Sequence, residues 1–406
     1  MKTSSLHNNK IIIILLVLLA FFGLKFLPLK STNWDYPNLL LLLFLVWNSI
    51  STNTLYAKLI LGYSFFIFLS CLYSCFYNDQ AFYLVVVHSY KYFSILFIFY
   101  LVKKNIPYQA AEKILVTIGA ICCLCYIFQW LIYPVILFSG VDGNKASEIS
   151  YRVRIPGSIS CYCLFFYGIN KYLIKRKIKY LIYSTFGFFP ILMMGFRSLL
   201  TFTLLFFFLL FPLVLRKFGK TLVYSLIGIF ALLIVTQTDL VKSKIDEMNH
   251  RNETNQTFEN ENYIRWKELD YYWNEQFTRP AEKVFGGGVP TDLESKYANT
   301  IYGYAYDKGL FWDDLGLVGL SMIIGIPAVT LLVLLYLVCI WRCKEPELQY
   351  IRVTLAVVLL ASLFTNSEVY RQGNLLLLTL FLYIEYKYHL EKAYRSRGII
   401  KRKTKY

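Results

Sequence analysis

Arginine residues at the ends of apolar segments are the side chains that most suggest chemistry in this sequence. Arg152 and Arg154 precede one apolar segment in Tyr-Arg-Val-Arg-Ile-Pro-Gly, and Arg197 stands between two others in Gly-Phe-Arg-Ser. A charge at membrane depth costs about 2.5–3.5 kcal/mol on insertion scales, so it usually faces a cavity or a partner. One guanidinium group can donate two parallel hydrogen bonds to the oxygens of a phosphate, and it stays protonated. Arginines at these positions therefore fit an anionic lipid headgroup such as a pyrophosphate.

Two further candidates are among the arginines of the polar stretch between residues 239 and 313. Arg265 opens a helical pattern there and Arg279 closes it. We expect both to join the arginines that bind phosphate. The alternative for all of these arginines is pairing with acids such as Glu148 or Asp314, or contact of their long side chains with lipid phosphates.

Three aspartates flank the return of the chain into its next apolar segment, namely Asp307, Asp313 and Asp314. A carboxylate at this place can accept the proton of a sugar hydroxyl as a general base, and Asp307 is our candidate. Asp313 and Asp314 better suit capping of the helix that follows, because carboxylates stabilise helix N-termini.

His88 and Lys91 lie within one apolar segment, and their spacing of three residues places them on one face of a helix. They suit either a proton relay, as in a transporter, or a polar pair that packs helices together, and we favour the second interpretation.

A glycine triplet, Gly286 to Gly288, interrupts the polar stretch. It lacks the Lys-Ser/Thr and the strand–helix context of a phosphate-binding loop. We expect a flexible turn that lets the backbone approach a ligand.

The elements that position these residues are helices that cross a membrane. The sequence is 57% hydrophobic and only 17% charged, whereas soluble domains are nearer 25% charged. Apolar residues come in blocks long enough to cross a bilayer as helices. We expect an all-α polytopic membrane protein with about 12 transmembrane helices. The expected spans are 11–29, 38–54, 57–77, 81–102, 114–138, 157–173, 180–196, 198–215, 221–238, 314–341, 351–366 and 374–390.

The orientation follows from the basic residues, which gather in alternate connections and in the tail after residue 386. Such connections stay in the cytoplasm, so both termini are expected to be cytoplasmic. Residues 239–313 then form one large loop outside the cytoplasm, with 14 acidic and 9 basic residues. It separates a first bundle, 1–238, from three C-terminal spans and a basic tail, 314–406.

Several kinds of partner are not expected. The net charge of +17 is spread in short clusters between apolar blocks, and no nucleic-acid-binding motif is present. None of the nine cysteines lies in the large loop, so neither a disulfide framework nor a zinc site is indicated. We expect no metal and no cofactor.

The order of these motifs resembles the superfamily of O-antigen polymerases and O-antigen ligases, best from about residue 152 to 325. The resemblance is carried by Arg152-Val-Arg-Ile-Pro-Gly, Gly195-Phe-Arg-Ser, the loop with Arg265, Pro280 and the glycine triplet, and the return Trp312-Asp-Asp-Leu-Gly-Leu-Val-Gly. The ligase branch usually has a His about eleven residues before the return glycine. Position 305 is Ala in this chain, which favours the polymerase branch.

The resemblance implies a membrane glycosyltransferase of the GT-C type in the bacterial inner membrane, with its active site facing the periplasm. Its substrate is an oligosaccharide on undecaprenyl pyrophosphate, transferred to another lipid-linked repeat unit during lipopolysaccharide or surface-polysaccharide synthesis. Membrane lipids and a chain-length regulator protein are the implied partners. Arg197 and Arg265 are the implied catalytic arginines, and Trp266, Trp273 and Tyr304 suit stacking on sugar rings. A ligase acting on lipid A core or protein, and a transporter or flippase of precursors, are the alternatives.

Overall fold

The computed structural model describes residues 35–51, 55–132, 135, 137–138, 155, 157–194, 197–215, 264–291, 294–363, 369–370 and 373–396. Across these ranges every regular element is a helix, which confirms the all-α prediction. The expected spans 11–29 and 221–238 lie outside the described residues, as do Arg152 and Arg154.

Helices lie at each of the other expected spans. The first half of the chain gives α2 (Asp35–Trp47), α3 (Ala57–Tyr77), α4 (Phe82–His88), α5 (Tyr90–Phe93), α6 (Phe97–Lys104), α7 (Tyr108–Leu131), α8 (Ile159–Lys175), α9 (Lys179–Met193) and α10 (Arg197–Leu215). The second half gives α13 (Ile264–Asp270), α14 (Pro280–Phe285), α15 (Lys296–Asn299), α16 (Gly316–Ile324), α17 (Ile326–Arg342), α18 (Gln349–Ala361) and α19 (Asn374–Ser396).

Three of these helices, Ala57–Tyr77, Tyr108–Leu131 and Ser198–Leu215, are long and apolar enough to cross a membrane. A fourth span results if α4 and the helical stretch Tyr90–Lys104 are counted as one bent segment. The chain is thus a helical protein with segments that can span a bilayer, and the count of 12 spans stays a prediction.

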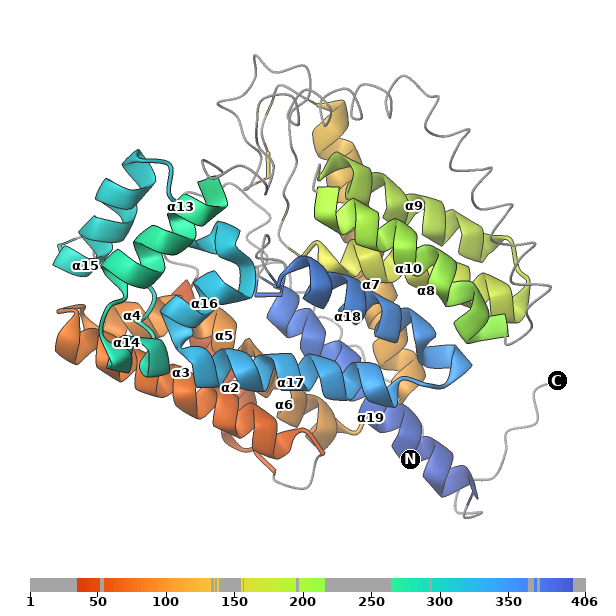
Figure 1. Ribbon diagram of the computed structural model, residues 1–406. Coiled ribbons are helices and arrows are strands. Elements are labelled where there is room, and N and C mark those ends of the chain that lie inside the picture. Colours follow the sequence, from red (N-terminus) through yellow and green to blue (C-terminus); the bar gives the residue numbers. More distant parts are fainter. Residues whose placement is uncertain are drawn as a thin grey trace.

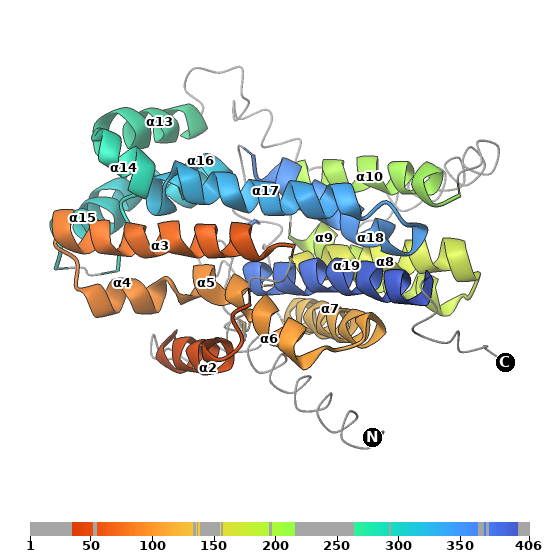
Figure 2. The same ribbon diagram turned by 90° about the horizontal axis from the view of Figure 1, so that it is seen from below.

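The long helices pack side by side, and the short helices α13, α14 and α15 gather at one end (Figures 1 and 2). We call this end the loop end, and the end with the C-terminus of α19 the tail end. Helix α8 lies at the centre of one half and packs against α7, α9, α10 and α18. It approaches α9 closely at Gly187, which has no side chain. A Cβ at that position would lie only 2.4 Å from the backbone nitrogen of Phe165 in α8. Helices α3 and α17 form the main contact of the other half.

Two expected spans are broken instead of continuous. The segment 81–102 is interrupted at Ser89, where α4 and the stretch Tyr90–Lys104 meet at a bend of 50°. The segment 314–341 is interrupted at Gly325, whose φ of 86° ends α16 before α17 begins. Helix breaks inside a bundle expose backbone groups, which need other partners.

The glycine triplet supplies those partners at the second break. The Gly287 N–H donates to Met322 O at 2.8 Å, and the Gly288 N–H donates to Ile323 O at 2.9 Å. From α3, the Ser70 hydroxyl donates to Ile323 O at 2.9 Å. The prediction of a flexible turn was therefore wrong: the missing side chains let the loop backbone pack against the broken helix.

Buried ionic groups link the helices away from the loop end. Between α7, α8 and α18, Lys171 Nζ lies 2.7 Å from Glu112 Oε1, and the Tyr350 hydroxyl donates to the same oxygen at 3.1 Å. Toward the tail end, the carboxylate of Glu385 accepts hydrogen bonds from the Tyr56 hydroxyl and from Arg342 Nε at 2.5 and 2.7 Å. Charges buried this deeply need such pairing, and the pairs fix which helices are neighbours.

Candidate functional site

The return of the loop into the bundle brings several charged residues together at the loop end. Helix α13 continues into a π-helical segment η4 (Tyr271–Gln276), and a short 3-10 helix η6 (Trp312–Leu315) leads into α16. Helix α13 packs against η6, and η6 against α16. We call Lys91, Arg265, Glu268, Asp313 and Asp314 the return cluster.

Arg265 is the centre of the return cluster. Its Nη1 lies 2.5 Å from Asp314 Oδ2 and 2.8 Å from Glu268 Oε2. Glu268 also accepts the Phe311 N–H at 3.1 Å, so its two oxygens hold Arg265 and the returning chain together. The pairing of an arginine with Asp314 was the alternative interpretation, and it applies to Arg265. The guanidinium side chain is still 21% exposed, which leaves part of it accessible to a ligand.

Burial controls the protonation of Glu268. Its side chain is only 1% exposed. Burial raises its pKa from 4.5 to about 7, and the nearby Arg265 guanidinium opposes that rise. For Arg265 itself, burial lowers the pKa, while Asp314 and Glu268 together raise it above its usual value. Arg265 therefore stays charged at all working pH values, whereas Glu268 changes its charge near neutrality.

Lys91 approaches the cluster from the break between α4 and α5. Its ammonium group lies 4.9 Å from the centre of the Tyr92 ring, and it forms no ion pair within the described part of the chain. The acids whose fields reach it are Asp313 and Asp35. His88 and Lys91 lie on opposite sides of the break between α4 and α5, and His88 Nδ1 lies 3.0 Å from Asp35 Oδ2.

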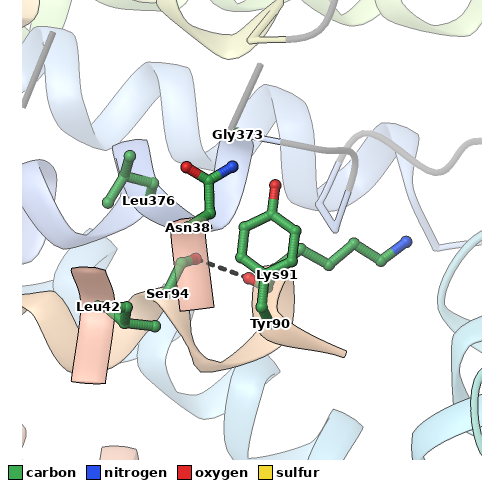
Figure 3. Close-up of a pocket in the computed structure, with 7 residues that line it drawn as sticks. All are labelled: Asn38, Leu42, Tyr90, Lys91, Ser94, Gly373 and Leu376. Carbon is green, nitrogen blue, oxygen red and sulfur yellow. Dashed lines mark hydrogen bonds between the residues drawn. The ribbon is translucent and has the colours of Figure 1, made fainter. Parts of the chain in front are cut away.

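A small cavity adjoins the base of Lys91. It is lined by Asn38, Leu42, Tyr90, Lys91, Ser94, Gly373 and Leu376 and has a volume of about 20 Å³. Figure 3 shows the side chain of Lys91 extending away from Asn38 and Leu376. A cavity of this size accommodates a water molecule and not a phosphate group. The cavity is therefore too small to be a phosphate site. If Lys91 contacts an anionic substrate, it does so through its ammonium group.

An open groove runs along the exposed side of α13 and η4. Its volume is about 440 Å³, and it is lined by Trp266, Leu269, Asp270, Trp273, Asn274 and Val318. Trp266, Asp270 and Trp273 thus share one side of α13 and η4. Phe277, which follows η4, is buried instead.

The other predicted site residues are not members of the return cluster. For Arg197, at the start of α10, the structure does not describe the side chain. Asp307 is exposed in the helical residues that directly follow the π-helical segment Thr300–Ala305. Arg279 is exposed at the start of α14, where its N–H donates to Glu282. The ring of Tyr304 is 52% exposed, and Lys308 donates to its hydroxyl.

Capping of α16 by Asp313 or Asp314 is not observed, since no side chain caps that helix. Both aspartates lie one turn earlier, in η6. Sequence reasoning also missed Glu268, although its spacing of three residues from Arg265 was a usable signal for an ion pair. No group of three or more His, Cys, Asp or Glu residues in the described ranges has the arrangement of a metal site.

The return cluster thus offers two cations and up to three carboxylates beside an aromatic groove. Such a set can bind an oxyanion, accept a proton from a hydroxyl and stack on planar or ring-shaped groups. No protein-family model matches the sequence, and no curated protein matches it significantly, so the chemistry of these residues has to carry the functional argument.

Proposed function

We propose that this chain is a surface-polysaccharide polymerase of the bacterial inner membrane. In this proposal the loop end faces the periplasm, and both termini are cytoplasmic. The enzyme transfers a glycan from undecaprenyl pyrophosphate to another lipid-linked repeat unit. The observation that carries the proposal is the return cluster, in which the partly exposed Arg265 bridges Glu268 and Asp314. The sequence resemblance to O-antigen polymerases supports the same reaction.

The reaction needs stabilisation of a departing pyrophosphate and removal of one proton. The acceptor hydroxyl attacks the anomeric carbon, a new glycosidic C–O bond forms, and the C–O bond to the lipid pyrophosphate breaks. Charge grows on the leaving oxygen, so cations placed there stabilise the transition state more than the ground state. Arg265 and Lys91 are the described residues that fit this role, with Arg152, Arg154 and Arg197 as the further arginines predicted from the sequence.

The proton of the acceptor hydroxyl needs a carboxylate. Asp313, a member of the return cluster, is half-buried in η6, whereas the predicted base Asp307 is exposed and is not a member of the cluster. Asp313 is therefore our preferred general base. Glu268 has both oxygens engaged and acts as a positioning residue that holds Arg265 against Asp314.

The test is complementation of a deletion strain with Arg265→Ala, Arg265→Lys and Asp313→Asn. The deletion strain should carry surface glycans of a single repeat unit instead of a ladder. Arg265→Ala and Asp313→Asn should fail to restore the ladder, and Arg265→Lys should restore it in part because the charge is kept but the bidentate pairing is lost. Full ladders in the deletion strain, or with both Arg265→Ala and Asp313→Asn, would refute the proposal. A fusion reporter at Tyr406 should report a cytoplasmic C-terminus.

A transporter of polysaccharide precursors is the second candidate function. The break between α4 and α5, with His88 paired to Asp35 at 3.0 Å, favours it, because broken helices with ionisable residues mark transport sites in membrane proteins. A transporter deletion strain would retain its repeat units in the cytoplasmic leaflet. Single units that still reach the cell surface in the deletion strain would exclude this role. Long lipid-linked polymer would instead indicate the ligase alternative.

A further inference from the structure

The groove beside α13 combines two indole rings with a polar pair. Trp266 is 48% exposed and Trp273 is half-buried, and both line the same side of the helix. In the same lining, Asn274 Nδ2 donates to Asp270 Oδ1 at 2.7 Å. Leu269 and Val318 of α16 complete the lining. The groove is thus a shallow surface with aromatic faces and a hydrogen-bonding centre.

The helical period explains why these side chains share one surface. The chain is α-helical to Asp270 and π-helical from Tyr271 to Gln276. A π-helical segment is rare, and where it occurs it is frequently part of a functional site. The wider turn rotates the residues after Asp270, so that Trp273 and Asn274 line the groove while Tyr272 stays buried against Leu310, to which its hydroxyl donates at 3.0 Å.

These groups match the chemistry of a saccharide chain. The C–H faces of sugar rings are apolar and pack on aromatic rings, whereas their hydroxyls need both donors and acceptors. Asp270 Oδ2 and Asn274 Oδ1 provide acceptors, and the second Nδ2–H of Asn274 provides a donor. An open groove suits a saccharide chain that advances along it by one repeat unit at a time. Each sugar ring can bind there without being enclosed.

The same groups disfavour a membrane lipid as the occupant. An acyl chain would cover the Asp270 carboxylate, and burying an unpaired charge is unfavourable. An anionic headgroup would be repelled by the same carboxylate. The Trp273 ring attracts cations, but the ammonium group of Lys283 already lies 4.5 Å from the centre of that ring. Lys283 therefore repels a cationic headgroup.

We propose that this groove binds the saccharide chain of the substrate next to the return cluster and thereby sets the length of the product. The inference rests on the proposed polymerase function. Trp266 follows Arg265 directly, and Asp270 lies two residues after Glu268, so a glycan held in the groove has its end near the reacting groups. A chain held between additions dissociates less often, and the polymer grows longer before release.

The test measures binding of short oligosaccharides, released by mild acid from the parent strain's surface polysaccharide, to the purified full-length protein. Trp266→Leu and Trp273→Leu keep an apolar surface but remove the aromatic face, and each should weaken binding roughly three- to tenfold. Trp266→Tyr should weaken binding less. Asp270→Asn should weaken it as well, because a charge-assisted acceptor is lost. In cells, the Leu variants should shift the ladder to shorter chains while polymerisation continues.

Trp341→Leu is the matched control. Trp341 is also exposed and also carries a lysine over its ring, Lys344 at 3.8 Å, but it lies at the far end of α17. It should leave binding and chain length unchanged. Unchanged oligosaccharide binding in both Leu variants would overturn the groove assignment. So would loss of co-purifying phospholipid in the Leu variants combined with unchanged binding in Asp270→Asn, since that pattern identifies a lipid site. Failure of the polymerase proposal would show instead as ladders in the deletion strain, and the binding measurement would still decide the groove.

Discussion

The attachment of the glycine triplet to the broken span α16–α17 gives a prediction that separates two physical effects. Gly286 ends α14 with φ 77° and ψ 163°, a conformation that is essentially restricted to glycine. A Cβ at this position would also lie 2.3 Å from Ile323 O and 2.6 Å from Gly325 N. Both contacts are with backbone, which cannot rotate away. Gly286→Ala must therefore strain its own backbone and push the triplet off the helix.

The two costs can be estimated separately. The conformational strain costs about 1–3 kcal/mol. Displacement lengthens the two hydrogen bonds from Gly287 and Gly288 to α16, each contributing about 0.5–1.5 kcal/mol. The sum is about 2–6 kcal/mol of the free energy of unfolding. Gly309 is the matched position, because its φ is 73° and nothing lies within 4 Å of its Cβ. Gly309→Ala should cost only the conformational part, about 1–2 kcal/mol.

The assay is thermal unfolding of both variants and the parent protein in the same detergent. Gly286→Ala should lower the melting temperature at least twice as far as Gly309→Ala. It should also expose the segment from residue 264 to 291 to protease at a temperature where Gly309→Ala stays protected. Equal decreases in melting temperature would refute the reasoning, since they would mean that the triplet is not docked on α16 and that only the sign of φ matters.

Two further predictions concern ionisable groups. Folded Glu268, with a pKa of about 7, keeps a proton that the unfolded chain releases near pH 4.5, so its contribution to stability is full below pH 4.5 and falls as the pH rises to about 7. Glu268→Gln should flatten that decline in a melting series from pH 4.5 to 8, and an unchanged slope would contradict the assignment. Lys171→Met leaves the buried Glu112 without its cationic partner, with only the Tyr350 hydroxyl bonded to it, and should destabilise the protein by about 3–5 kcal/mol. The double variant with Glu112→Met should recover most of that loss in the same melting assay.

The positions of the helices were predictable because the apolar blocks are long and sharply bounded. The segment 57–77 was predicted at its observed bounds: an apolar run ends at Asn78-Asp79, and Asp79 adopts a φ of 50°. Helix α6 ends in the same way at Asn105, with a φ of 52°. Asparagine and aspartate tolerate this left-handed conformation better than other side chains, so such residues after an apolar block mark helix ends.

The two helix breaks were not predictable from the same pattern. Hydrophobicity continues through Ser89 and through Gly325, so each segment looked like one span. At the α16–α17 break Gly325 adopts a φ of 86° and Pro327 lies in the first turn of α17. The carbonyls of Met322 and Ile323 instead accept hydrogen bonds from Gly287 and Gly288, more than thirty residues away in sequence. Periodicity describes neighbours along a helix and contains no information about a distant loop that competes for the same carbonyl groups.

The candidate site was predictable in its residue types and less so in its pairing. Arg265 was expected to bind an anion, and its alternative partner Asp314 was also anticipated. The structure adds Glu268, and it separates His88 from Lys91 because the helix breaks between them. Which residues pair depends on which elements pack together at the loop end. Arg265 pairs with Asp314 because α13 packs against η6, and η6 is too short to give a periodic signal in the sequence.

The loop holds α16 at both of its ends, and this has a consequence for the proposed reaction. At one end Arg265 bonds Asp314 just before α16, and at the other the glycine triplet bonds Met322 and Ile323. Val318, which lines the glycan groove, lies between the two attachments. Groove and return cluster are thus fixed to one short helix, so a change that loosens the triplet moves the groove relative to the cations. Gly286→Ala should therefore shorten the polymer at temperatures where the protein is still folded, whereas Gly309→Ala, which touches neither attachment, should leave the length distribution unchanged.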